Sequence, residues 1–114
     1  DVSTQDVEKK EICYTQTSIS KLSSTSVSIF QTTETNAKAA AIQGFMFVQR
    51  WNNNKWEKYA TREFNKGNTT ICESTYTVSV ESGYYYRLAV SHFAVFVDSD
   101  NSSCNTYSRA IYVN

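Results

Sequence analysis

The chain is 114 residues long, which is the length of one domain and enough to bury a core of its own. Its 11 lysine and arginine residues match its 11 aspartate and glutamate residues, so it lacks the positive field on which nucleic-acid binding depends. No run of the sequence reaches the roughly 18 apolar residues of a transmembrane helix. We therefore expect no nucleic-acid partner and no insertion into a membrane.

The residue usage favours strands over helices. Serine, threonine, asparagine and tyrosine are abundant, whereas proline is absent and leucine occurs only as Leu22 and Leu88. Such a composition is typical of strands that expose one face to water. It predicts an all-β fold.

The first part of the chain leads into two strands. Residues 1–10 are polar and show no hydrophobic period, which predicts a flexible lead-in before a folded domain over 11–114. Alternating apolar and polar residues predict strands over 12–22 and 25–34. The alanine-rich stretch 37–41 is too short for a stable helix, so we expect a loop or a single turn there.

The middle of the chain contains a predicted strand over 42–51 that is apolar on both faces. Three successive asparagines follow it and predict a hairpin turn into a strand over 55–65. A Lys-Gly-Asn sequence at 66–68 predicts a break before the next strand, over 69–80.

Gly83 and Tyr86 mark the start of a strand predicted over 84–97. Gly83 supplies the backbone freedom of a turn, and Leu88 and Val90 follow Tyr86 on the same side of the strand. This spacing resembles the start of strand F in fibronectin type III and immunoglobulin-like domains. In those domains a tyrosine corner sends its hydroxyl back to the upstream backbone. The resemblance implies a structural role for Gly83 and Tyr86.

A final strand predicted over 104–113 brings the total to seven. We therefore expect a single immunoglobulin-like (fibronectin type III-like) sandwich of about seven antiparallel strands. Immunoglobulin domains carry a cysteine two residues after the corner tyrosine. Here that position is Leu88, so the resemblance favours the fibronectin side.

Three cysteines leave the disulfide pattern open. In the fibronectin-like arrangement, the strands of Cys13 and Cys104 lie at the same edge, so the resemblance implies a structural Cys13–Cys104 bond. Cys72 shares the predicted core side of its strand, and we expect it to be a small buried hydrophobe. Pairing of Cys72 with either other cysteine, or no disulfide at all, stays open.

The sequence offers no constellation for catalysis. His92 is the only histidine and lies within a predicted strand, and no nucleophile elbow or glycine-rich phosphate loop occurs. The acidic turn at 98–101 resembles the start of a calcium loop, but Ser103 and Arg109 occupy the glycine and bidentate glutamate positions. We therefore expect no enzyme activity, no cofactor and no metal site.

The surplus of aromatic residues is more informative. If Met46 and Leu88 face the core, the opposite face of the same two strands carries four apolar side chains, namely Phe45, Phe47, Phe93 and Val95. An exposed apolar patch is typical of a binding surface, so we expect contact with a protein partner or a second copy here. A bulge that reverses the side-chain alternation, or coverage by 37–41, is the alternative.

A second aromatic group flanks the asparagine turn. Trp51, Trp56 and Tyr59 are residue types that stack on sugar rings, which gives carbohydrate binding as an alternative function. Hairpin tryptophans also pair across strands for purely structural reasons. A structural spacer without a partner is the third interpretation.

A pattern over 12–113 resembles a family of small secreted proteins of Gram-positive bacteria whose function is unknown. It comprises the segments at 42–56 and 80–88 and the closing Ala-Ile-Tyr-Val at 110–113. The resemblance implies a lone sandwich domain that is exported, and it supplies no catalytic residue. The start at Asp1 rather than methionine agrees with a processed product, so we expect a secreted, extracellular protein.

Overall fold

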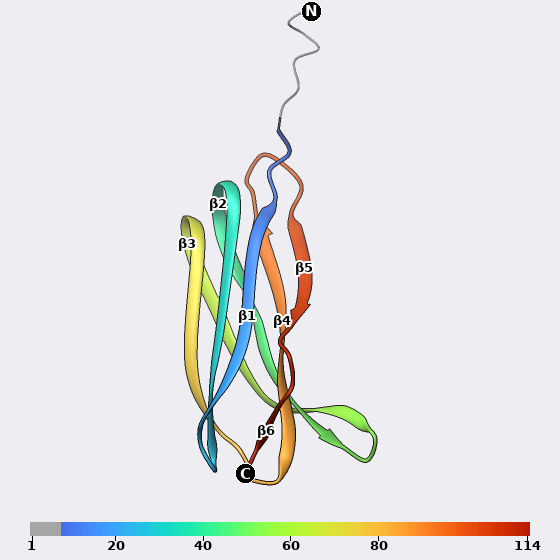
Figure 1. The fold of residues 1–114 in the computed structure, drawn as a ribbon. Helices are drawn as coiled ribbons and strands as arrows, with labels where there is room; N and C mark the ends of the chain where they lie inside the picture. Colours follow the sequence, from blue (N-terminus) through green and yellow to red (C-terminus); the bar gives the residue numbers. More distant parts are fainter. Residues whose placement is uncertain (1–7) are drawn as a thin grey trace, which may run out of the picture.

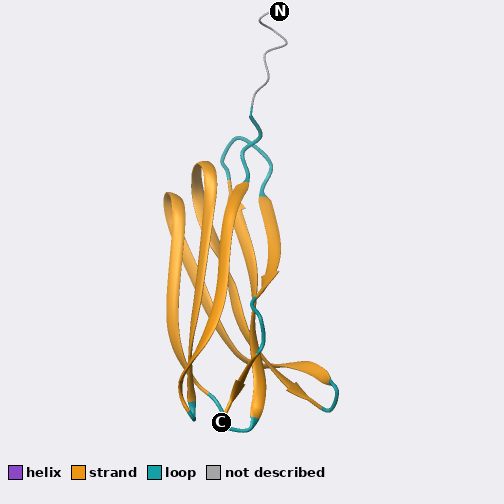
Figure 2. Ribbon diagram, in the orientation of Figure 1, coloured by secondary structure: helices purple, strands orange, loops and turns teal. Residues whose placement is uncertain are grey.

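A computed structural model describes residues 8–114 and shows an all-β protein (Figure 1 and Figure 2). The lead-in expected over 1–10 lies mostly outside the described residues. Six antiparallel strands form one strongly curled sheet with the shape of a half-barrel. They are β1 (Ile12–Ser23), β2 (Ser26–Asn52), β3 (Lys55–Ser79), β4 (Tyr84–Val95), β5 (Ser102–Tyr107) and β6 (Ile111–Val113).

The sheet is organised around β2, which pairs with three other strands. β3 follows one edge of β2 from the pair Asn52↔Lys55 to the pair Ser26↔Ser79. The other edge of β2 is shared, because β1 pairs with its first part and β4 pairs with residues 41–50. β5 and β6 continue the sheet beyond β4.

The turn between β2 and β3 forms as the asparagines predict. Asn53 and Asn54 have φ angles of 54° and 62°, so both central residues of a two-residue hairpin turn lie in the left-handed region. Asparagine tolerates this region better than most residues, and such turns match the twist of the paired strands. The turn therefore fixes the register of the long β2–β3 hairpin.

The predicted loop at 37–41 and the predicted break at 66–68 are wrong, because both stretches lie within strands. The β2–β3 ribbon bends over at the end that carries the β2 and β3 labels in Figure 1, and the two strands keep pairing through Ala39↔Thr69 and Ala41↔Gly67. At this bend the pairing register shifts between Glu34 and Ala39, and Ala39 faces the core without any exposed surface.

The strand count changes for the same reason. The predicted strands 25–34 and 42–51 are joined as β2, and the predicted strands 55–65 and 69–80 are joined as β3. The predicted strand 104–113 is instead divided into β5 and β6. Ser108 lies between β5 and β6, where the regular pairing with β4 is interrupted. Its amide donates to the Leu88 carbonyl oxygen at 2.8 Å, and its hydroxyl accepts from the Leu88 amide at 2.8 Å.

The curl of the sheet brings β1 beside β5. Side chains rather than a ladder of backbone hydrogen bonds join these strands within residues 8–114. The Ile12 amide donates to Ser102 Oγ at 3.1 Å, and the hydroxyls of Thr17 and Thr106 are hydrogen-bonded to each other. In the described part of the chain β3 pairs only with β2, so its outer edge is open.

The core fills the inside of the curled sheet, and β2 contributes to it along most of its length. The largest fully buried side chains of the core include Tyr86, Ile29, Ile42, Met46, Leu88, His92 and Gln31. The expected core side of the predicted strands is therefore the observed one, because Met46 and Leu88 are both buried completely.

Tyr86 anchors the turn between β3 and β4. Its ring is fully buried, and its hydroxyl donates to the Glu81 carbonyl oxygen at 2.7 Å and accepts from the Glu81 amide at 3.1 Å. Gly83 lies inside this turn with a φ of 97°, a value that a side chain would strain. Burial raises the pKa of the Tyr86 hydroxyl, so it remains a donor at neutral pH.

Candidate functional site

The outer face of the β2–β4 pair presents phenylalanines to solvent. The register between β2 and β4 is unbroken from Ala41↔Val95 to Arg50↔Tyr86, so no bulge reverses the side-chain alternation between these two strands. Phe45 is 39% exposed and Phe93 is 41% exposed, whereas Phe47 and Val95 are half-buried. Phe45 and Phe47 stack with ring centroids 5.9 Å apart. The structure thus places all four predicted residues on strands that pair with each other.

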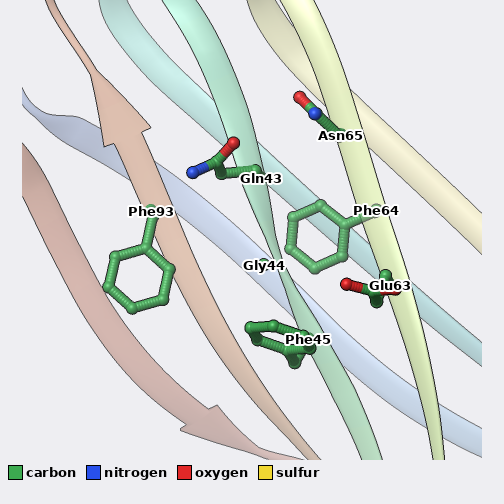
Figure 3. Close-up of a pocket in the computed structure, with 7 residues that line it drawn as sticks. All are labelled: Gln43, Gly44, Phe45, Glu63, Phe64, Asn65 and Phe93. Atoms are coloured by element: carbon green, nitrogen blue, oxygen red, sulfur yellow. The ribbon is translucent and has the colours of Figure 1, made fainter.

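A groove of about 560 Å³ lies beside these rings (Figure 3). Phe45 and Phe93 provide its apolar walls, and polar groups come from Gln43, Glu63 and Asn65. The remaining lining residues are Gly44 and Phe64, which lie opposite each other on β2 and β3. The groove combines aromatic surface with hydrogen-bonding groups, which is typical of a binding site.

Gly44 determines how closely the strands around this groove approach. A Cβ atom at this position would lie 1.9 Å from the Ser91 carbonyl oxygen and 2.6 Å from Cζ of Phe64. Only glycine therefore permits the Phe64 ring to cover β2 here. The Phe64 side chain is 5% exposed in this position. Sequence reasoning did not identify Gly44, because its role depends on two strands that are distant in the chain.

A second aromatic group occupies the tip of the β2–β3 hairpin, which projects from the body of the molecule in Figure 1. Trp51 and Trp56 form a cross-strand pair with ring centroids 5.3 Å apart in an edge-to-face arrangement. Together with Tyr85 and Ala110 they line a shallow groove of about 330 Å³. Sequence reasoning did not identify Tyr85 as part of this group.

Tyr59, the third predicted sugar-stacking residue, lies away from the two tryptophans. The pairing register shifts here, with Val48 opposite Ala60 and Gln49 opposite Lys58, so Tyr59 is the extra residue of a β-bulge. Its ring packs edge-on against Tyr86 with ring centroids 5.5 Å apart, within the anchor of the β3–β4 turn. The structure therefore brings Trp51 and Trp56 together without Tyr59.

The side of the hairpin that carries Tyr59 holds a half-buried cation. Arg50 donates to Glu57 at 2.9 Å and to Glu81 at 3.0 Å, and its guanidinium carbon lies 4.4 Å from the centre of the Tyr84 ring. The hydrogen bond with Glu57 raises the pKa of Arg50, and the same bond lowers the pKa of Glu57. Both groups are therefore charged at neutral pH, and they tie the hairpin to the β3–β4 turn.

His92 lies at the centre of a chain of hydrogen bonds that crosses the core. It has no exposed surface, its Nδ1 lies 2.6 Å from Thr33 Oγ1, and its Nε2 lies 2.7 Å from Thr106 Oγ1. The Gln31 amide nitrogen donates to the Cys72 carbonyl oxygen, so the Gln31 side-chain oxygen accepts the Thr33 hydroxyl proton at 2.6 Å.

This chain fixes Nδ1 of His92 as a nitrogen that carries a proton. Because the Thr33 hydroxyl proton is used, its oxygen must accept from Nδ1 of His92. Burial lowers the pKa of His92 to about 4, so the ring is neutral at physiological pH and Nε2 accepts from the Thr106 hydroxyl. Such a histidine is a structural group and has no access to a substrate.

The Cys13–Cys104 disulfide that the resemblance implies is not present, and all three cysteines are free thiols. The reason is the direction of the Cys13 side chain. A register irregularity separates Ile12 from Tyr14, and Cys13 Sγ contacts the Glu34 carbonyl oxygen of β2 at 3.5 Å, on the side of β1 away from β5. Cys72 is 4% exposed, and burial raises the pKa values of both Cys72 and Cys104.

The part of the chain that the structure describes brings no three histidine, cysteine or acidic residues together as metal ligands. Over the same residues, no helix is long and apolar enough to cross a bilayer. No protein-family model matches the chain, and no curated protein matches it in sequence. The assignment of a function therefore depends on the aromatic surfaces.

Proposed function

We propose that this chain is a secreted, non-catalytic binding module that contacts a protein partner or a second copy of itself through the outer face of β2 and β4. One observation carries the proposal, namely that Phe45 and Phe93 are each about two-fifths exposed on the same side of the sheet. Leaving two phenylalanine rings in water forfeits roughly 1 kcal/mol for each ring. A partner that covers them recovers this free energy.

The groove beside these rings supports a protein contact. Aromatic side chains are enriched in interface cores, and Gln43, Glu63 and Asn65 supply the polar rim that orients a partner. The rings also sit on paired strands rather than on loops, so little conformational entropy is lost when they are covered. Export is proposed from the resemblance to the secreted bacterial family.

We also interpret the curled sheet as immunoglobulin-like. The first part of β2 pairs with β1 and with the end of β3, whereas its later part pairs with β4 and with the start of β3. The bend at Ala39 therefore divides the ribbon into two halves. The strands beside each half are arranged as in the two sheets of a fibronectin type III domain. The corner hydrogen bonds of Tyr86 support the same interpretation.

The contact is tested by placing a photo-crosslinking phenylalanine analogue at position 93 and, as a matched control, at the exposed Tyr14 of β1. The expected result is one defined adduct, either a homodimer or a single partner, that depends on position 93. The double variant F45S/F93S should lose this contact and keep a cooperative unfolding transition. A monomer without position-dependent adducts contradicts the proposal and favours the structural spacer.

Carbohydrate recognition is the second candidate, and the shallow groove between Trp51, Trp56 and Tyr85 favours it. The exposed Trp51 and the half-buried Trp56, at the tip of a projecting hairpin, offer a stacking surface for sugar rings. A glycan array is the direct test. The absence of any bound glycan, or binding that is unchanged in W51A and W56A, removes this candidate.

A further inference from the structure

Arg87 of β4 is held in place beside one of the two tryptophans. Its guanidinium carbon lies 4.5 Å from the centre of the Trp56 ring and 4.6 Å from the centre of the Tyr107 ring. Its Nε donates to Gln49 Oε1 at 2.7 Å, in the cross-strand pair Gln49↔Arg87. Three contacts from β2, β3 and β5 thus fix one half-buried cation.

The charge of Arg87 has no counter-ion among residues 8–114, in contrast to Arg50, which is paired with Glu57 and Glu81. A guanidinium carries five N–H donors, and the Nε of Arg87 uses only one of them. Its terminal nitrogens form no hydrogen bond within the described part of the chain. Arg87 is therefore an oriented cation whose donor fork is unused.

We propose that Arg87 binds the carboxylate of an acidic sugar whose ring lies in the groove beside the tryptophans. The planar fork of arginine matches the two oxygens of a carboxylate, and such charge-assisted pairs are about twice as strong as neutral hydrogen bonds. Trp56 belongs to both features, since it stacks on Arg87 and lines the groove. A single ligand can therefore reach the ring surface and the cation together.

The surrounding charge favours an anionic ligand over a neutral one. Lys58 pairs with Gln49 from β3 as Arg87 does from β4, so the two cations flank the same residue of β2. The Nζ atom of Lys58 lies 5.4 Å from the centre of the Phe47 ring. The nearby acidic residue of the hairpin, Glu57, is engaged by Arg50. This role of Arg87 rests on carbohydrate recognition, the second candidate function.

The experiment titrates the full chain with D-glucuronic acid and with methyl D-glucuronate, its uncharged ester, while NMR follows the two indole N–H signals. The wild type is expected to bind the acid about tenfold more tightly than the ester, with shifts at Trp56. R87Q should lose this preference. R87K should lose most of it, because an ammonium lacks the planar fork. R62Q removes another half-buried arginine of the sheet, whose hydrogen bond is to the Thr61 carbonyl oxygen, and it serves as the matched control.

The outcomes separate this inference from the function on which it rests. Equal binding of acid and ester, lost in W56A but retained in R87Q, overturns the role of Arg87 and leaves carbohydrate recognition standing. No saturable binding of either sugar overturns the role of Arg87, and a glycan array without any bound glycan overturns carbohydrate recognition as well. In that case a drop in thermal stability of R87Q identifies the stacked guanidinium as a structural group alone.

Discussion

Lowering the pH from 7 to 5 should destabilise the protein through His92. The unfolded chain binds a proton at His92 near pH 6.5, whereas the folded chain does so only at about pH 4. The folded pKa is the lower one, so this stability is fully present above pH 6.5 and is lost as the pH falls toward 4. The whole difference corresponds to about 3 kcal/mol, and about 2 kcal/mol of it is lost between pH 7 and pH 5.

Urea unfolding at pH 7 and pH 5, followed by circular dichroism, measures this loss. In thermal unfolding of a domain of this size, the same loss of 2 kcal/mol lowers the Tm by about 8 °C. The variant H92Q has no group at this position that titrates in this window. Its own stability is lower at both pH values, but it should change by less than about 0.5 kcal/mol between them.

His92 is the only histidine in the chain, so NMR can follow its ring protons without ambiguity. In the folded protein these signals should stay nearly constant from pH 7.5 to pH 5. A titration midpoint near 6.5 in the folded state refutes the reasoning. So does an equal loss of stability in wild type and H92Q, because the loss would then come from other groups.

Three further predictions follow from the packing. Y86F should lower the free energy of unfolding by about 1–2 kcal/mol in urea titrations, because both backbone groups that its hydroxyl contacts lose their partner; an unchanged midpoint contradicts the anchor. G44A should cost about 2–3 kcal/mol in the same assay, whereas G67A, whose Cβ meets only ordinary contacts, should stay within about 1 kcal/mol of the wild type. With a thiol reagent, Cys13 should react at once and Cys72 only on unfolding; a protein that lacks free thiols contradicts the structure.

The alternation of side chains could be predicted from the sequence wherever one face of a strand is buried. Met46 and Leu88 face the core, and Phe45 and Phe93 face solvent, because a period of two leaves no other choice between unbroken strands. The asparagine turn was predictable for a similarly local reason. Asn53 lies in the left-handed region that its residue type tolerates.

The structure differs from the sequence-based predictions where long-range contacts decide the local conformation. Alanines at 37–41 signal a loop when considered alone, yet Ala39 and Ala41 pair with Thr69 and Gly67 of β3, and this pairing holds the stretch in a strand. The bulge at Tyr59 has no sequence signal, and it moves that ring from the tryptophans to Tyr86. The direction of the Cys13 thiol likewise depends on a register irregularity beside Glu34.

The continuous β2–β3 hairpin has a consequence for the order of folding. Its first pair, Asn52↔Lys55, closes over two residues, and each later pair up to Ser26↔Ser79 is added close to one already formed, even across the register shift between Ala39 and Glu34. The entropy of closing a long loop is therefore not lost at any step along this ribbon. We expect the hairpin to zip from its turn before the N-terminal and C-terminal strands join it, so that they add to a template that already exists.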